Sequence, residues 1–172
     1  MKQRPPPHGQ LHERLGLPAW LIVTLGLVAV PRAVLHDLGV VTEAGPVNLL
    51  LVFAPPLVWI AVAVRTAGNP FLGLLAVGGT YGVCLAAVHN IFWSRVWAGD
   101  PPRLGGNLAG RFTAGQEDLL MRGATTLSSL FTGIAVGTIC GAIAWALTQL
   151  LRRRDAARRG NTGLDEASDS SL

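Results

Sequence analysis

Residues 125–151 read TTLSSLFTGIAVGTICGAIAWALTQLL, and Arg152, Arg153 and Arg154 follow directly. The run holds 27 residues without a charge, whereas about 20 apolar residues are enough to cross the hydrocarbon core of a bilayer. The arginines after it indicate the cytoplasmic side, because Lys and Arg are concentrated in cytoplasmic segments. This stretch predicts an integral membrane protein with a cytoplasmic C-terminus.

The composition of the whole chain agrees with this class. Of its 172 residues, 50% are hydrophobic and 14% are charged, compared with about 25% charged residues in ordinary soluble proteins. The net charge is +4, but most basic residues flank apolar runs, so we interpret them as topology signals and expect no nucleic-acid partner. The expected environment is a lipid bilayer. The Ala, Gly, Leu and Arg bias and the small size suggest a bacterial inner membrane.

Three further apolar segments precede the decisive run. We expect spans over residues 17–38, 46–64 and 71–93, which with 125–151 form an all-α bundle of four transmembrane helices within residues 17–151. Proline lacks an N–H and its ring clashes with the preceding turn, so it interrupts a helix. Pro31 therefore predicts a kink in the first span, and Pro55 with Pro56 predicts a kink or local unwinding in the second.

Polar segments complete the organisation. Residues 1–16 predict a disordered cytoplasmic tail, and residues 152–172 predict a basic and then disordered cytoplasmic tail. Residues 94–124 form the outer loop, and the sequence leaves open whether 116–124 lie on the surface or extend the last span.

The charge distribution predicts that both termini are cytoplasmic. The inner side would carry nine Lys and Arg residues and the outer side four, with Arg32 near the outer edge. The inner residues are Lys2, Arg4, Arg14, Arg65, Arg152, Arg153, Arg154, Arg158 and Arg159, and the outer residues are Arg95, Arg103, Arg111 and Arg122.

Two stripes of small residues predict helix packing. The first stripe is Gly78, Gly82 and Ala86, and the second is Gly133, Gly137 and Gly141. Residues four apart share one helix face, and small residues let helices approach closely in a bilayer, where the hydrophobic drive between helices is weak. Two hypotheses follow: the stripes pack against each other, or one stripe packs against a second copy of the chain.

One polar cluster is a candidate site. It consists of Arg32, His36 and Asp37 at the end of the first span and His89 and Asn90 at the end of the third. In the predicted topology both sets lie near the outer boundary. Ionisable residues inside a membrane are costly and are therefore functional candidates. The structural alternative is that these side chains reach the interface and pair with one another or with Glu43.

The cluster supports two functional hypotheses. In the first, His36, Asp37 and His89 relay a proton in a transport or proton-conducting component. In the second, His36 and His89 bind a haem or a metal ion in a redox protein. The two cysteines, Cys84 and Cys140, lie in apolar runs without CxxC or Cys/His spacing, so the sequence predicts no zinc or thioredoxin-type site.

No familiar catalytic motif occurs in the sequence. It lacks a GxSxG elbow, an HExxH zinc motif, a P-loop and a glycine-rich dinucleotide turn, so we predict no catalytic residue and favour a non-enzymatic role. The leading hypothesis is an accessory or interaction subunit that packs through its glycine stripes against another membrane protein or a second copy. Proton conduction and redox chemistry are the alternatives.

Overall fold

The computed structural model describes residues 15–42, 44–66 and 68–169, with the side chains of α7 described as far as residue 159. Regular structure in this part of the chain is helical throughout. Four helical segments are long and apolar enough to cross a membrane, namely Ala19–Asp37, Pro46–Val64, Pro70–Ile91 and Ala114–Arg159. Most of the tail predicted over residues 1–16 lies outside the described residues, as does Glu43.

The first apolar segment is two helices, α2 (Ala19–Val28) and α3 (Val30–Asp37). Pro31 lies in the first turn of α3, where its missing N–H is tolerated. Before it, the N–H of Ala29 donates to Gly26 O at 3.4 Å, and Trp59 Nε1 donates to Leu25 O at 2.8 Å. The indole thus satisfies a carbonyl beside the break and ties α2 to α4.

The second apolar segment is one helix, α4 (Pro46–Val64). Pro46 occupies its first turn, and Pro55 and Pro56 lie inside it. The local unwinding expected at Pro55 and Pro56 does not occur. Adjacent prolines remove two N–H donors in a single turn, and the remaining apolar residues keep the helix continuous.

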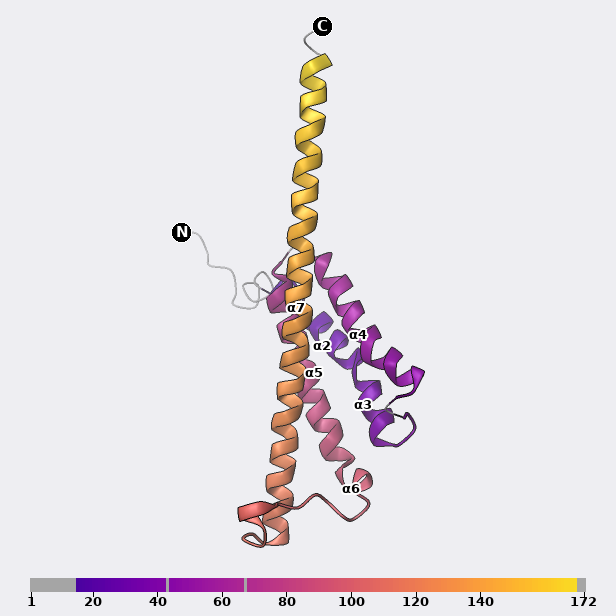
Figure 1. Ribbon diagram of the computed structural model, residues 1–172, viewed down its shortest axis with the longest axis vertical. Helices are drawn as coiled ribbons and strands as arrows, with labels where there is room; N and C mark the ends of the chain where they lie inside the picture. The colour runs from indigo at the N-terminus through magenta and orange to yellow at the C-terminus, as the bar shows by residue number, and fades with distance from the viewer. Residues whose placement is uncertain (1–14, 43, 67, 170–172) are drawn as a thin grey trace, which may run out of the picture.

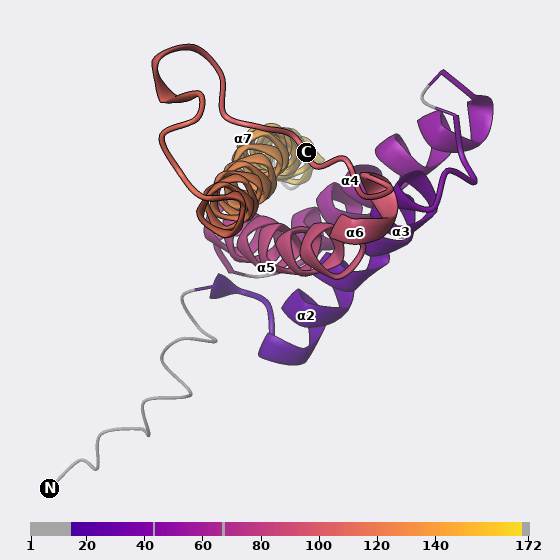
Figure 2. The same cartoon turned by 90° about the horizontal axis from the view of Figure 1, so that it is seen from below.

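The third and fourth apolar segments lie side by side along the bundle as α5 (Pro70–Ile91) and α7 (Ala114–Asp169) (Figures 1 and 2). Between them the chain forms the short helix α6 (Trp93–Val96) and the 3₁₀ turn η1 (Gly106–Leu108). The core lies where α2, α4, α5 and α7 meet. Trp59, Leu74, Val77 and Ala144 are each 0% exposed there.

α7 begins earlier than the predicted span. Thr113 N donates to Gln116 Oε1 at 3.0 Å, and Gln116 N donates to Thr113 Oγ1 at 3.4 Å. This reciprocal pair is a capping box, which starts a helix by satisfying N–H groups that lack partners. Residues 116–124 therefore lie in the first turns of α7 and are continuous with the last span, which is one of the two alternatives that the sequence left open.

α7 also ends later than the predicted span. It runs to Asp169, where the sequence analysis expected disorder after the arginines. Residues 152–159 are Arg, Asp and Ala without Pro or Gly, and most of them propagate a helix that has already started. This end of α7 projects beyond the other helices (Figure 1).

Candidate functional site

The predicted polar cluster contains a chain of three side chains from three helices, which we call the relay. Asp37 is the last residue of α3, His89 lies in the last turn of α5, and Ser129 lies on α7. His89 Nε2 is 3.7 Å from Asp37 Oδ1, and His89 Nδ1 is 3.1 Å from Ser129 Oγ. A carboxylate, an imidazole and a hydroxyl thus follow one another across the bundle.

Hydrogen bonding fixes the tautomer of His89. Ser129 Oγ donates its hydrogen to Thr125 O at 2.8 Å, so the hydroxyl oxygen is left to accept from His89 Nδ1. A neutral His89 then presents an unprotonated Nε2 toward Asp37. With this tautomer both Nε2 and Asp37 Oδ1 are acceptors, so a donor such as a water molecule is needed between them.

Asp37 is the most enclosed group of the relay. Its side chain is 6% exposed, and its Oδ2 is buried without a hydrogen-bond partner among the described residues. His36 Nδ1 lies 3.5 Å from Oδ1 of the same carboxylate. A buried carboxylate oxygen without a donor is costly while the group is ionised. This cost makes Asp37 a functional candidate among the described residues.

Three cavities connect with these side chains. One of about 180 Å³ is lined by Asp37, His89 and Trp93. A second, of about 350 Å³, is lined by His89 and Ser129, and a third, of about 370 Å³, is lined by His36 and Asp37. Each exceeds the ~30 Å³ that one water molecule occupies in the liquid. Water in the first cavity can bridge the 3.7 Å between His89 and Asp37, which is too long for a direct hydrogen bond.

Asn90, the neighbour of His89, does not join the relay. Its Nδ2 donates to Ala86 O at 2.9 Å and to Thr126 Oγ1 at 3.0 Å, so it fastens α5 to α7. Arg32 is also separate, because its Nε donates to Asn48 Oδ1 on α4 at 3.2 Å. The five residues predicted as one cluster therefore divide, and His36, Asp37 and His89 stay together.

A second polar group lies between α6 and the start of α7. Trp93 Nε1 donates to Asp118 Oδ1 at 2.8 Å, and Arg122 Nε donates to Asp118 Oδ2 at 2.8 Å. The Arg122 guanidinium also lies over the Trp93 ring, 5.0 Å from its centroid. The hydrogen bond from Arg122 lowers the pKa of Asp118, outweighing desolvation. Asp118 lies before the apolar run 125–151 of α7. The contacts among Trp93, Asp118 and Arg122 therefore hold α6 against the start of α7.

The two glycine stripes face each other. A Cβ built on Gly78 would lie 2.6 Å from Gly137 Cα, and one built on Gly133 would lie 2.5 Å from Gly82 Cα. At that separation only glycine leaves room for the opposite backbone. Gly141 meets Phe71, and Ala86 is 7% exposed. α5 and α7 therefore cover each other's stripes, so these faces are occupied within one chain.

The haem or metal hypothesis gains no support from this geometry. Within the described ranges no group of three or more His, Cys, Asp or Glu side chains is arranged to hold a metal ion. His36 and His89 approach the same carboxylate oxygen, and His89 directs its second nitrogen to Ser129. The described contacts of His89 are those of a chain from the Asp37 carboxylate through the imidazole to the Ser129 hydroxyl.

Ser129 is a site residue that was not predicted from the sequence. A serine in an apolar helix ordinarily bonds its own backbone, and Ser129 does so with Thr125 O. Its contact with His89 depends on how α5 and α7 are rotated, for which the glycine stripes are the available signal. Comparison with protein families, curated proteins and solved structures finds no match to this chain.

Proposed function

We propose that this chain is a multi-pass protein of the cell membrane that conducts protons through the Asp37–His89–Ser129 relay. The membrane part of the proposal is supported by the four apolar helices and by large apolar side chains on the outside of the bundle. Ile91 is 75% exposed, Phe131 74% and Leu50 66%. Such side chains are stable on a surface that faces lipid. We retain the proposed cytoplasmic location of both termini and a bacterial inner membrane as its setting.

The proton part rests on one observation, the carboxylate–imidazole–hydroxyl chain in which a half-buried His89 lies between the buried side chains of Asp37 and Ser129, with cavities on either side of His89. Histidine exchanges protons near neutral pH, and chains of Asp, Glu and His are the usual proton relays of membrane proteins. A proton can enter from the cavity beside His36, move to Asp37 and then to His89. His89 then releases the proton from Nδ1 to water in the second cavity, which His89 and Ser129 both line.

Proton flux in reconstituted vesicles tests this proposal. The full chain would be placed in vesicles that hold a pH-sensitive dye, and a pH step would be applied with a potassium ionophore present. Ser129→Ala removes the hydroxyl that orients His89, and Thr138→Ala is the control, because Thr138 lies on the same helix and its hydroxyl bonds its own backbone at Ile134 O. We expect flux in the wild type and the control and a clear loss in Ser129→Ala. If the vesicles of both variants showed the same flux as vesicles without protein, the proposal would be refuted.

An accessory subunit that works through a partner is the second candidate. Its original basis, the glycine stripes, is occupied between α5 and α7. The projecting end of α7 favours it instead, since Arg152, Arg153 and Arg154 are exposed there. Retention of a stoichiometric partner by the wild-type chain in mild detergent, and its loss when these three arginines become Gln, would support this function.

A further inference from the structure

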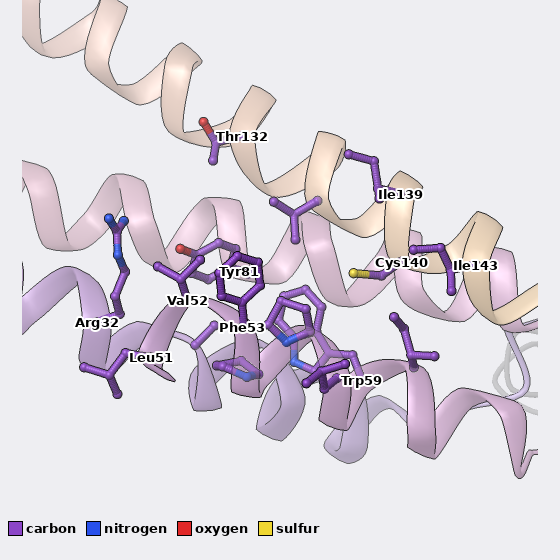
Figure 3. A pocket seen from close by; sticks show the side chains of 16 residues that line it. Arg32, Leu51, Val52, Phe53, Trp59, Tyr81, Thr132, Ile139, Cys140 and Ile143 are labelled. Atoms are coloured by element: carbon purple, nitrogen blue, oxygen red, sulfur yellow. The ribbon is translucent and has the colours of Figure 1, made fainter. Parts of the chain in front are cut away.

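A second site lies apart from the relay, in a cavity of about 510 Å³ that α4, α5, α7 and the junction of α2 and α3 line and that opens to the outside of the bundle (Figure 3). This volume lies within the ~300–1,000 Å³ range of small-molecule sites. The walls are almost entirely apolar and include Phe53, Trp59, Ile139 and Ile143. A lining of this kind favours a ligand whose larger part is apolar.

The polar groups of this cavity gather at one end. Figure 3 shows Arg32, Thr132 and the hydroxyl of Tyr81 at that end, and Cys140 and Ile143 toward the other. Arg32 uses its Nε to bond Asn48 Oδ1, which fixes the guanidinium. In the described part of the chain its Nη groups have no hydrogen-bond acceptor. A guanidinium held in this way matches a carboxylate, which accepts two parallel N–H bonds.

From this layout we infer that the cavity binds a long-chain carboxylic acid, with its carboxylate at Arg32 and its chain along α4 and α7. One arginine supplies one positive charge, which balances one carboxylate, and the Tyr81 hydroxyl is a further donor at the same end. The apolar walls hold the hydrocarbon chain. This site shares no residue with the relay, so the two proposals can fail independently.

Trp59 gives this inference a direct reporter. Its side chain is 0% exposed and lines the cavity, so a bromine atom inside the cavity lies close enough to quench its fluorescence. The wild-type chain in detergent would be titrated with bromine-labelled palmitate. Subtracting the quenching measured in Trp59→Phe isolates the signal of Trp59 from that of the other tryptophans.

We expect saturable quenching of Trp59 by the bromine-labelled acid and much weaker quenching by the corresponding brominated alcohol or by brominated phosphatidylcholine. Arg32→Gln should weaken the acid at least about tenfold, the order of affinity that a hydrogen bond to a charged group supplies. Arg103→Gln is the control, because Arg103 is exposed on the loop. Equal quenching by all three probes would mean that they only contact the protein as lipids do, and this would overturn the site. An unchanged affinity for the acid in Arg32→Gln would also overturn it.

A second variant covers the case in which Arg32→Gln does not fold. Ile139 lines the cavity and is 61% exposed, so Ile139→Phe can narrow the space with less strain than a change in the core and adds no tryptophan to the signal. We expect this variant to keep its helical circular dichroism and to block quenching of Trp59 with Arg32 intact. Undiminished quenching in the folded variant would refute the site.

Discussion

His89 on α5 and Ser129 on α7 lie 3.1 Å apart, from Nδ1 to Oγ, at the point where the carboxylate of Asp37 reaches the other side of the imidazole. This contact depends on the close approach of α5 and α7, which their glycines permit. The packing of two apolar helices therefore places a titratable group between an acid and a hydroxyl.

The tautomer of His89 is the first testable consequence. Since Ser129 donates to Thr125 O, neutral His89 should carry its proton on Nδ1. Nitrogen NMR of ¹⁵N-histidine-labelled protein at neutral to alkaline pH should show that tautomer for the signal that disappears in His89→Gln. Ser129→Ala should release the preference, and Thr138→Ala should leave it unchanged. A dominant Nε2-protonated form in the wild type would contradict the hydrogen-bond assignment.

Gly137 tests the packing of α5 on α7. A Cβ at Gly137 would lie 2.7 Å from Leu74 O and 2.9 Å from Gly78 Cα, so Gly137→Leu forces the helices apart. We expect a loss of about 1–3 kcal/mol of stability, the usual cost of overpacking, and a lower thermal midpoint in detergent. Gly123→Leu is the control on the same helix, because a Cβ there meets nothing within 4 Å. Equal midpoints for the two variants would show that this contact does not hold the bundle.

The Asp118 group gives an acid-dependent prediction. Its pKa lies below the ordinary 3.8 because Arg122 hydrogen-bonds the carboxylate. The ionised carboxylate therefore stabilises the folded state fully above pH 3.8, and this contribution is lost as the pH falls through the lowered pKa. Tryptophan fluorescence should show an acid transition from Trp93 below pH 3.8 that Asp118→Asn abolishes. A wild-type titration that superimposes on that of the variant would exclude this coupling.

The proposed orientation predicts which segments a membrane-impermeant thiol reagent reaches in intact cells. In a background without Cys84 and Cys140, a cysteine at Gly105 in the loop should be labelled from outside. A cysteine at Ala156, exposed on α7, should be labelled only after permeabilisation. Labelling of Ala156→Cys in intact cells would reverse or remove the proposed topology.

Much of the helical content was predictable from residues alone. Apolar length predicts four helices, and Pro46 predicts where α4 begins, because a proline is well tolerated in the first turn. The early start of α7 was also readable, since Thr113 and Gln116 have capping-box spacing. The sequence analysis overlooked this signal in a polar segment.

The composition of the site was only partly predictable. Asp37 and His89 stand out because ionisable groups are rare in apolar runs. Ser129 does not, since a serine in such a helix usually bonds its own backbone. Likewise, Arg32 turns toward Asn48 because of the break between α2 and α3 and the position of α4. Which partner such a side chain meets depends on how each helix is rotated about its axis, and the residue pattern of a single helix does not determine that rotation.

The most direct test of the central claim is proton flux in vesicles containing Asp37→Asn, compared with Asp100→Asn. The first change keeps the shape of the buried side chain and removes its ability to exchange a proton, and the second changes an exposed loop carboxylate. The relay predicts that Asp37→Asn falls to the level of empty vesicles while Asp100→Asn matches the wild type. Wild-type flux through Asp37→Asn would contradict the account.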